Sequence, residues 1–216
     1  MSFHCYDPII AKNVASDLLS IEAIRLSPDK PFTWASGWKS PIYCDNRLSL
    51  SYPPIRSRIK NYLCRAIKAT YTDVEAIAGV ATAGIPQGAL VAEELNVPFI
   101  YVRSKSKGHG LANQIEGKVE KGMKVAVLED LVSTGGSSLA AVEALDNQGI
   151  QTLGMVSIFT YGFPIAEANF NKANTSLVYL SDYNTMLELA LETEIISESV
   201  LDTLQSWRND PSNWEG

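Results

Sequence analysis

The chain has 216 residues, of which 46% are hydrophobic and 19% are charged, and its formal net charge is −6. This length fits one domain with a substantial core, and the acidic balance argues against a general nucleic-acid binder, which usually carries a basic excess. No apolar run approaches the roughly 20 residues that span a bilayer, and we expect no signal peptide. Three scattered cysteines without a C-x-x-C pair predict free thiols and a cytoplasmic protein.

Apolar periodicity predicts helices and strands that alternate along most of the chain. A helix is expected within the first 30 residues. Aromatic and β-branched residues from Phe32 to Leu50 then predict a hairpin or short extended segments, and Pro53 and Pro54 open a helix that runs to about Thr70. Further along we expect strands at 76–80, 97–102, 125–128, 152–159 and 176–180, helices at 86–95, 137–148 and 165–172, and two final helical stretches.

Strands that alternate with helices imply right-handed crossovers and an α/β fold with a mainly parallel central sheet flanked by helices. We therefore expect a single domain over residues 1–216. Within it, residues 1–50 would form a small N-terminal hood subdomain that contains a helix and a hairpin. Residues 103–123 lack apolar periodicity and exceed the usual length of a connection, so we expect a mobile lid there.

The segment that follows the predicted strand at 125–128 is the most informative one. Residues 129–137 read Glu-Asp-Leu-Val-Ser-Thr-Gly-Gly-Ser. Small residues at the start of a helix expose unpaired N–H groups and the positive end of the helix dipole, which suit a phosphate. Glu129 and Asp130 can accept hydrogen bonds from sugar hydroxyls or hold a hard cation, although adjacent acids often only cap a turn. Together these features predict a site for a phosphorylated sugar.

Two other stretches are expected at the same edge of the sheet. Residues 82–86 form a small-residue turn after the strand at 76–80, although an ordinary helix start would look the same. Residues 103–110 contain Arg103, two lysines and His109 and no acid. Such a run is often only a solvated surface, but beside a strand end these cations suit a polyanion such as a diphosphate.

Other chemistries lack their motifs in this sequence. There is no G-x-x-x-x-G-K-[ST] for a nucleoside triphosphate, no G-x-G-x-x-G after the first strand, and no Gly-x-Ser-x-Gly elbow. Two histidines and three scattered cysteines do not provide a zinc site.

The segment from Val127 to Ser137 closely resembles the phosphoribosyl-diphosphate-binding motif of the type I phosphoribosyltransferase family. Residues 32–43, 103–110 and 113–117 resemble members of this family that act on the pyrimidine orotate, and the resemblance extends over most of residues 10–205. It implies a glycosyltransferase that transfers ribose 5-phosphate from 5-phosphoribosyl 1-diphosphate to orotate. The products would be orotidine 5′-monophosphate and diphosphate, in pyrimidine biosynthesis.

The resemblance also implies which residues bind the two substrates. Ser133 would touch orotate, and backbone groups at Tyr43 and Cys44 would contact the pyrimidine ring. The residues expected to hold the ribose hydroxyls and the 5′-phosphate are Glu129, Asp130, Leu131, Val132, Ser133, Thr134, Gly135, Gly136 and Ser137.

Catalysis is assigned to the lid by the same resemblance. Arg103, Lys107 and His109 would contact the diphosphate. Because orotate can supply an anionic ring nitrogen, no strong protein base is required, and we assign Lys107 and His109 to stabilising the leaving group. Mg²⁺ is the expected cofactor, bound mainly through the donor diphosphate without direct metal ligands from the chain. The lid would act across the interface of a homodimer, with no nucleic-acid or membrane partner.

Three positions depart from the family pattern. Many relatives carry lysine where this chain has Ala35, and some carry a second lysine where it has Ser104. Some use an arginine after the fourth strand to hold the orotate carboxylate, where this chain reads Phe159-Thr160-Tyr161. Another cation must then meet the carboxylate. We hypothesise that it is Arg47, because this residue follows the predicted hairpin.

Two other functions stay open at this point. A transferase for another base would share the donor site, so the choice of base depends on the hairpin. A binding regulator that kept the fold without catalysis would add a DNA-binding segment, and the first 30 residues contain no basic cluster.

Overall fold

The computed structural model describes residues 2–34, 37–104 and 114–214. The strands of the main sheet are β1 (Phe3–Cys5), β6 (Ala76–Val80), β7 (Phe99–Val102), β8 (Ile115–Glu116), β9 (Lys124–Val132), β10 (Gln151–Thr160) and β11 (Leu177–Asp182). Four short strands lie outside it: β2 (Ile24–Leu26), β3 (Phe32–Thr33), β4 (Lys39–Ser40) and β5 (Ile42–Cys44). The helices are α1 (Pro8–Ser20), α2 (Pro53–Thr70), α3 (Gly84–Leu95), α4 (Gly136–Asp146), α5 (Pro164–Lys172), α6 (Tyr183–Glu192) and α7 (Glu198–Asn209), with a 3-10 helix η1 (Asn46–Ser51).

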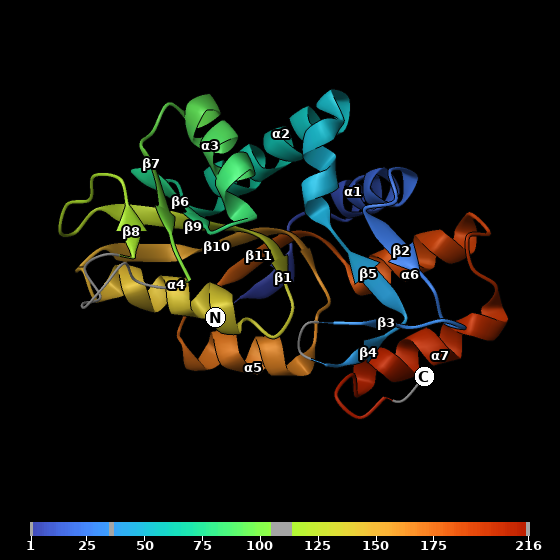
Figure 1. The fold of residues 1–216 in the computed structure, drawn as a ribbon. Helices are drawn as coiled ribbons and strands as arrows, with labels where there is room; N and C mark the ends of the chain where they lie inside the picture. The colour runs from blue at the N-terminus through green and yellow to red at the C-terminus, as the bar shows by residue number, and fades with distance from the viewer. Residues whose placement is uncertain (1, 35–36, 105–113, 215–216) are drawn as a thin grey trace.

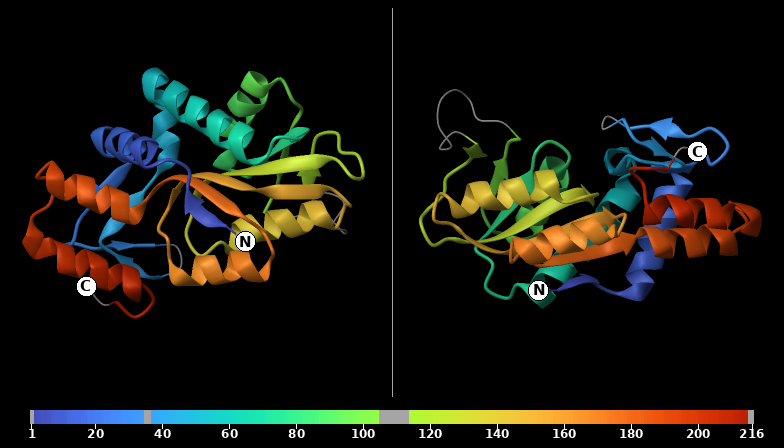
Figure 2. Two further views of the ribbon diagram at one scale, coloured as in Figure 1. Left: turned by 180° about the vertical axis from the view of Figure 1, so that it is seen from behind. Right: turned by 90° about the horizontal axis from the view of Figure 1, so that it is seen from below.

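The main sheet has the strand order β1-β11-β10-β9-β6-β7-β8, and every neighbouring pair is parallel except β7 and β8. Helices α2 and α3 lie against one face of this sheet and α4 and α5 against the other (Figures 1 and 2). The predicted α/β class with a mainly parallel, helix-flanked sheet is therefore confirmed. Among the described helices, none combines the length and the apolar composition needed to cross a membrane.

Helix α2 shows how the sequence pattern becomes packing. It begins at Pro53, as expected, because proline fits a first helical turn without losing a hydrogen bond. Its buried side chains Ile55, Ile59, Leu63 and Ile67 recur every four residues and belong to the main core. Burying each of them stabilises the fold by roughly 1.5–3 kcal/mol. Replacing the fully buried Ile59 with alanine would cost about 2–5 kcal/mol.

Two strands of the main sheet occur where no strand was expected. Residues Phe3–Cys5 form β1 and pair in parallel with Leu177–Tyr179 of β11. In the expected lid, Ile115 and Glu116 form β8 and pair with Val102 and Tyr101 of β7. This part of residues 103–123 is therefore tied to the sheet. Residues 105–113 lie outside the described residues.

The hood is built from both ends of the chain, not from residues 1–50 alone. Strand β2 pairs with β5, and β3 pairs with β4. Helices α6 and α7 lie beside these small sheets at one end of the molecule (Figure 1). The fully buried Trp207 of α7 joins the two parts, because its indole N–H donates to the carbonyl of Lys39 at 3.0 Å.

Candidate active site

The functional segment predicted at 129–137 joins the end of β9 to the start of α4, and we call it the junction segment. The sequence placed Glu129 after the strand, but β9 continues to Val132 because β10 pairs with it throughout. Glu129 is consequently a strand residue that is only 5% exposed. Its carboxylate accepts hydrogen bonds from the backbone N–H of Asp130 at 3.1 Å and from the hydroxyl of Ser138 at 3.0 Å. The role of Ser138 could not be read from the sequence.

The two adjacent carboxyl groups of the junction segment are both poorly solvated. Burial raises the pKa of Glu129 well above its ordinary value, and the neighbouring charge of Asp130 adds to the rise. Burial also raises the pKa of Asp130. A buried acidic pair of this kind is favourable only when a partner supplies hydrogen-bond donors or positive charge. Sugar hydroxyls or a hard cation would meet that need.

The loop Ser133–Gly136 prepares the start of α4 for an anion. Gly135 has φ +81°, and a β-carbon there would lie 2.8 Å from the ring of Phe170, so only glycine fits. No side chain caps α4, which leaves the N–H groups of its first turn available to a ligand. The carbonyl of Thr134 accepts a hydrogen bond from the Asn169 amide at 2.9 Å. Helix α5, which carries Asn169 and Phe170, therefore holds the loop in place.

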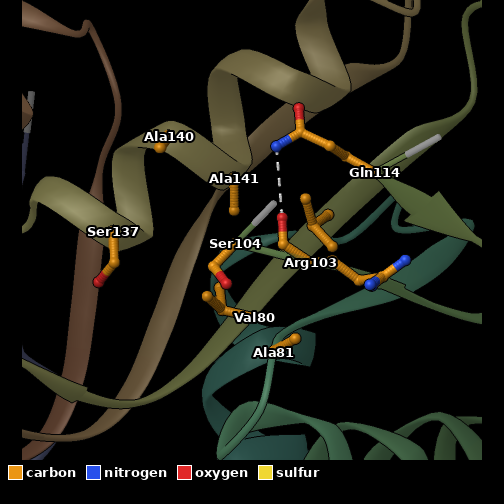
Figure 3. Close-up of a pocket in the computed structure, with 9 residues that line it drawn as sticks. Val80, Ala81, Arg103, Ser104, Gln114, Ser137, Ala140 and Ala141 are labelled. Atoms are coloured by element: carbon orange, nitrogen blue, oxygen red, sulfur yellow. Dashed lines mark hydrogen bonds between the residues drawn. The ribbon is translucent and has the colours of Figure 1, made fainter. Parts of the chain in front are cut away.

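On one side of the junction segment lies a cavity of about 170 Å³ that we call the edge cavity. Arg103 and Ser137, both predicted site residues, line it together with residues at the ends of β6 and β7 (Figure 3). The guanidinium of Arg103 is turned away from Ser137 and lies 3.6 Å from Glu116 of β8. The Gln114 amide donates to the carbonyl of Arg103 at 3.4 Å. The structure therefore brings Arg103 to the site, while its contact with a diphosphate stays a prediction.

The small-residue turn at 82–86 lies directly against the junction segment. Helix α3 begins at Gly84, and a β-carbon on this residue would lie 2.5 Å from the carbonyl oxygen of Leu128. This close approach requires glycine. The turn thus belongs to the site region, as the sequence suggested.

The junction segment also lines a second cavity, of about 400 Å³, which we call the aromatic cavity. Its lining combines predicted site residues with residues that sequence reasoning did not assign to the site. The predicted ones are Tyr43, Cys44, Leu131 and Ser133, and the others are Thr33, Trp34 and Tyr161. The rings of Trp34 and Tyr161 lie 5.1 Å apart, centroid to centroid. A flat, partly polar ring of pyrimidine size is the kind of ligand that such a space accommodates.

Asn46 ties the hood to the junction segment. Its side-chain amide donates to the backbone carbonyl of Asp130 at 2.7 Å, and its amide oxygen accepts a hydrogen bond from the Cys44 thiol at 3.3 Å. Asn46 is 2% exposed. One buried side chain therefore fixes the distance between the hairpin and the acidic pair. No pattern in the sequence distinguished this asparagine from an ordinary turn residue.

The remaining predicted residues are less closely connected to the site. The guanidinium of Arg47 forms two hydrogen bonds with Asp45, from Nε at 2.6 Å and from Nη2 at 2.8 Å, and the side chain is 60% exposed. It does not appear among the described residues that line the aromatic cavity. Its proposed contact with a carboxylate stays a prediction. Lys107 and His109 lie outside the described residues, and their roles stay predictions as well.

Similarity to known proteins defines the class of this protein. Residues 55–176 match the family model described as a phosphoribosyl transferase domain, so this is a phosphoribosyltransferase fold carrying the junction segment of that class. The chain is 57% identical to the orotate phosphoribosyltransferase of Porphyromonas gingivalis over 95% of this chain and 98% of the relative. It is 52% identical to the orotate phosphoribosyltransferase of Enterococcus faecalis, with the same coverage.

Solved structures agree with these relatives. The orotate phosphoribosyltransferase of Aeropyrum pernix superposes with a TM-score of 0.74 at 28% identity, over 85% of this chain and 99% of that one. The UMP synthase of Leishmania donovani gives 0.78 at 27% identity over 92% of this chain, which spans 42% of the length of that protein. The chain belongs to the orotate phosphoribosyltransferase family.

Proposed function

We propose that this enzyme transfers ribose 5-phosphate from 5-phosphoribosyl 1-diphosphate to orotate, giving orotidine 5′-monophosphate and diphosphate in pyrimidine biosynthesis. The observation that carries the proposal is that residues of the junction segment line both cavities. Ser137, near its end, lines the edge cavity, and Ser133, four residues earlier, lines the aromatic cavity. A ribose held along this segment would direct its anomeric carbon toward a base in the aromatic cavity.

The chemistry follows from this placement. The bond between the anomeric carbon and the diphosphate oxygen breaks, and its electron pair leaves with the diphosphate. A ring nitrogen of orotate forms the new bond through an oxocarbenium-like state. Glu129 and Asp130 would hold the ribose hydroxyls, and the N–H groups at the start of α4 would hold the 5′-phosphate. Arg103, with Lys107 and His109 of the lid, would stabilise the charge on the departing diphosphate.

Mg²⁺ is part of this proposal because the family resemblance implies it, and the donor set agrees. The acidic pair of buried Glu129 and half-buried Asp130 suits a hard cation, but no group of three or more metal-ligating side chains occurs within the described part of the chain. The ion would therefore be bound mainly through the donor diphosphate. Bound there, the ion would neutralise charge on the leaving diphosphate.

We propose a homodimer in which lid residues of one subunit complete the site of the other, and a cytoplasmic enzyme. The resemblance to the family supports the first. The free thiols of Cys5, Cys44 and Cys64 support the second, because reduced cysteines are typical of reducing compartments.

The proposed activity can be tested by mixing the enzyme with phosphoribosyl diphosphate and Mg²⁺ and following the consumption of orotate. Uracil and hypoxanthine serve as parallel acceptors. Orotate should be consumed with equal formation of diphosphate, and the other two bases should react far more slowly. Turnover of hypoxanthine but not of orotate would contradict the assignment of the base.

A further inference from the structure

The aromatic cavity meets an anionic base without a cation of its own. Orotate carries a carboxylate, yet the described residues that line this cavity are aromatic, aliphatic, thiol or hydroxyl side chains. Arg47 is held by Asp45, and the Lys39 ammonium donates to the Thr33 hydroxyl at 3.1 Å. A neutral hydrogen-bond donor inside the cavity could replace a cation, because a hydroxyl that donates to a carboxylate makes a short, charge-assisted bond.

Tyr161 is placed to be that donor. It comes directly after β10, which ends at Thr160, and it is 2% exposed. Its hydroxyl has no hydrogen-bond partner among the residues that the structure describes. Burial, followed by the nearby Cys44 thiol, raises the pKa of this hydroxyl well above its ordinary value, so that the hydroxyl remains a proton donor near neutral pH. Cys44 and Tyr43, two of the groups that act on this hydroxyl, line the cavity together with Tyr161, and this places the hydroxyl end of the ring near the cavity.

The ring of Tyr161 is held rigidly in this position. It stacks on the ring of Phe163, with the ring centroids 5.4 Å apart. It also packs edge-on against Trp207, with centroids 5.6 Å apart, and it contacts Trp34. Its backbone is fixed as well, because its carbonyl accepts a hydrogen bond from Arg208 Nε at 3.1 Å. A buried donor that is fixed and unpartnered is prepared for a ligand, since it needs no rearrangement to bind one.

We infer that Tyr161 is a specificity-determining residue whose hydroxyl donates a hydrogen bond to the carboxylate of the base. The inference rests on the proposed function, because it requires orotate or its nucleotide as the ligand. It assigns to a neutral side chain the task that the sequence led us to seek in a cation. It also explains why the departure at Phe159-Thr160-Tyr161 need not remove selectivity for orotate.

The test compares two nucleotides that differ only in this carboxylate, orotidine 5′-monophosphate and uridine 5′-monophosphate. Their dissociation constants are measured by calorimetry for the wild type and for Tyr161→Phe. The variant should bind orotidine 5′-monophosphate about 10-fold more weakly or worse, as expected for a lost hydrogen bond to a charged group. Its affinity for uridine 5′-monophosphate should stay within about twofold, because only the carboxylate loses a partner.

Tyr183→Phe is the matched control. Tyr183 belongs to the same aromatic cluster, but its hydroxyl is already satisfied by the carbonyl of Leu204 at 3.0 Å and it does not line the cavity. This control should keep the wild-type ratio of the two affinities. The melting temperature gives a second readout: Tyr161→Phe should melt no lower than the wild type, because no hydrogen bond to a described residue is lost, whereas Tyr183→Phe should melt lower.

The outcomes separate the inference from the proposed function. A wild type that prefers orotidine 5′-monophosphate, together with a Tyr161→Phe variant that keeps this preference in full, would overturn the inference and leave the proposed function standing. A wild type that binds neither nucleotide would overturn both. Equal weakening of both nucleotides by Tyr161→Phe would also overturn the inference, because the hydroxyl would then act on the ring or on the fold.

Discussion

The junction segment and the aromatic cavity are built in opposite ways. The junction segment is one continuous stretch, residues 129–137, whose carboxylates, hydroxyls and glycines reach the site because they follow one another in the chain. The aromatic cavity gathers Trp34 and Tyr43 from the hood, Leu131 from β9 and Tyr161 from the end of β10. A binding site formed by one continuous segment can be predicted from the sequence. A site whose residues come from distant parts of the chain can be recognised only in the structure.

The largest effect is expected on the side of the diphosphate. Lys107→Ala should lower kcat by about 10²–10³-fold, the usual cost of removing one charge-stabilising group, with a much smaller effect on donor binding. Single-turnover and steady-state kinetics measure the two separately. Lys118→Ala is the matched control on the same connection, because Lys118 is paired with Glu120 at 2.9 Å and is well exposed. Wild-type turnover by Lys107→Ala would remove this residue from the mechanism.

The link between the two regions should be the next most sensitive point. Asn46→Ala leaves the Asp130 carbonyl without its buried donor and should cost about 1–3 kcal/mol of unfolding free energy. Because the hairpin is then no longer fixed against the acidic pair, the KM for orotate should rise more than the KM for the donor. Chemical denaturation and initial rates check both expectations. If both KM values rose equally, Asn46 would have only a structural role.

Glu129→Gln should separate stability from function within the junction segment. Burial raises the pKa of Glu129, so the folded chain binds this proton more tightly than the unfolded chain does. The cost of burying the charge therefore appears as the pH rises above roughly 4.5 and grows up to the raised pKa. Near neutral pH the variant should be more stable by roughly 0.5–2 kcal/mol. Its donor KM should nevertheless rise, because the ribose hydroxyls lose an anionic acceptor.

Denaturant unfolding of the wild type and Glu129→Gln at pH 4 and pH 7 tests this prediction. The difference between the two proteins should be larger at pH 7. A difference that does not change with pH would show that Glu129 is not the group that loses a proton.

The smallest effect is expected at Arg47. The sequence suggested that Arg47→Ala would raise the KM for orotate far more than the KM for the donor. With its guanidinium held by Asp45 and its side chain 60% exposed, we now expect a rise of no more than about threefold, below that caused by Tyr161→Phe. Initial rates at varied orotate concentrations give the comparison. A larger effect at Arg47 than at Tyr161 would indicate that Arg47, and not Tyr161, binds the carboxylate of orotate.

The same difference separates the secondary-structure elements that could be predicted from those that could not. Helix α2 and strand β6 begin and end where their patterns indicated, because an amphipathic face and a fully buried apolar run are local signals. Strand β9 is longer than expected because pairing with β10 extends it through a buried carboxylate, against local preference. Strands β1 and β8 have three and two residues and exist only through their neighbours.

The site shows the same division. The sequence singled out the junction segment, the hairpin and Arg103, and residues from all three line the two cavities. Asn46 and Asn169 were not singled out, because each donates a hydrogen bond to a carbonyl that is distant in the chain. Ser138 was not singled out either, because it bonds the carboxylate of Glu129, which was expected in an exposed loop. Tyr161 was noticed only as a missing arginine. Its own role depends on three-dimensional contacts with Trp34 and Trp207.

Amide hydrogen exchange tests the division of labour between the two regions most directly. Exchange is measured for the wild type alone, with ribose 5-phosphate, and with orotidine 5′-monophosphate, which adds only the base. Ribose 5-phosphate should protect amides at 133–139, at the start of α4. The base should add protection at 33–34, 43–44 and 161–163. If ribose 5-phosphate protected the hood as strongly as the nucleotide does, the separation into a donor segment and a base cavity would be wrong.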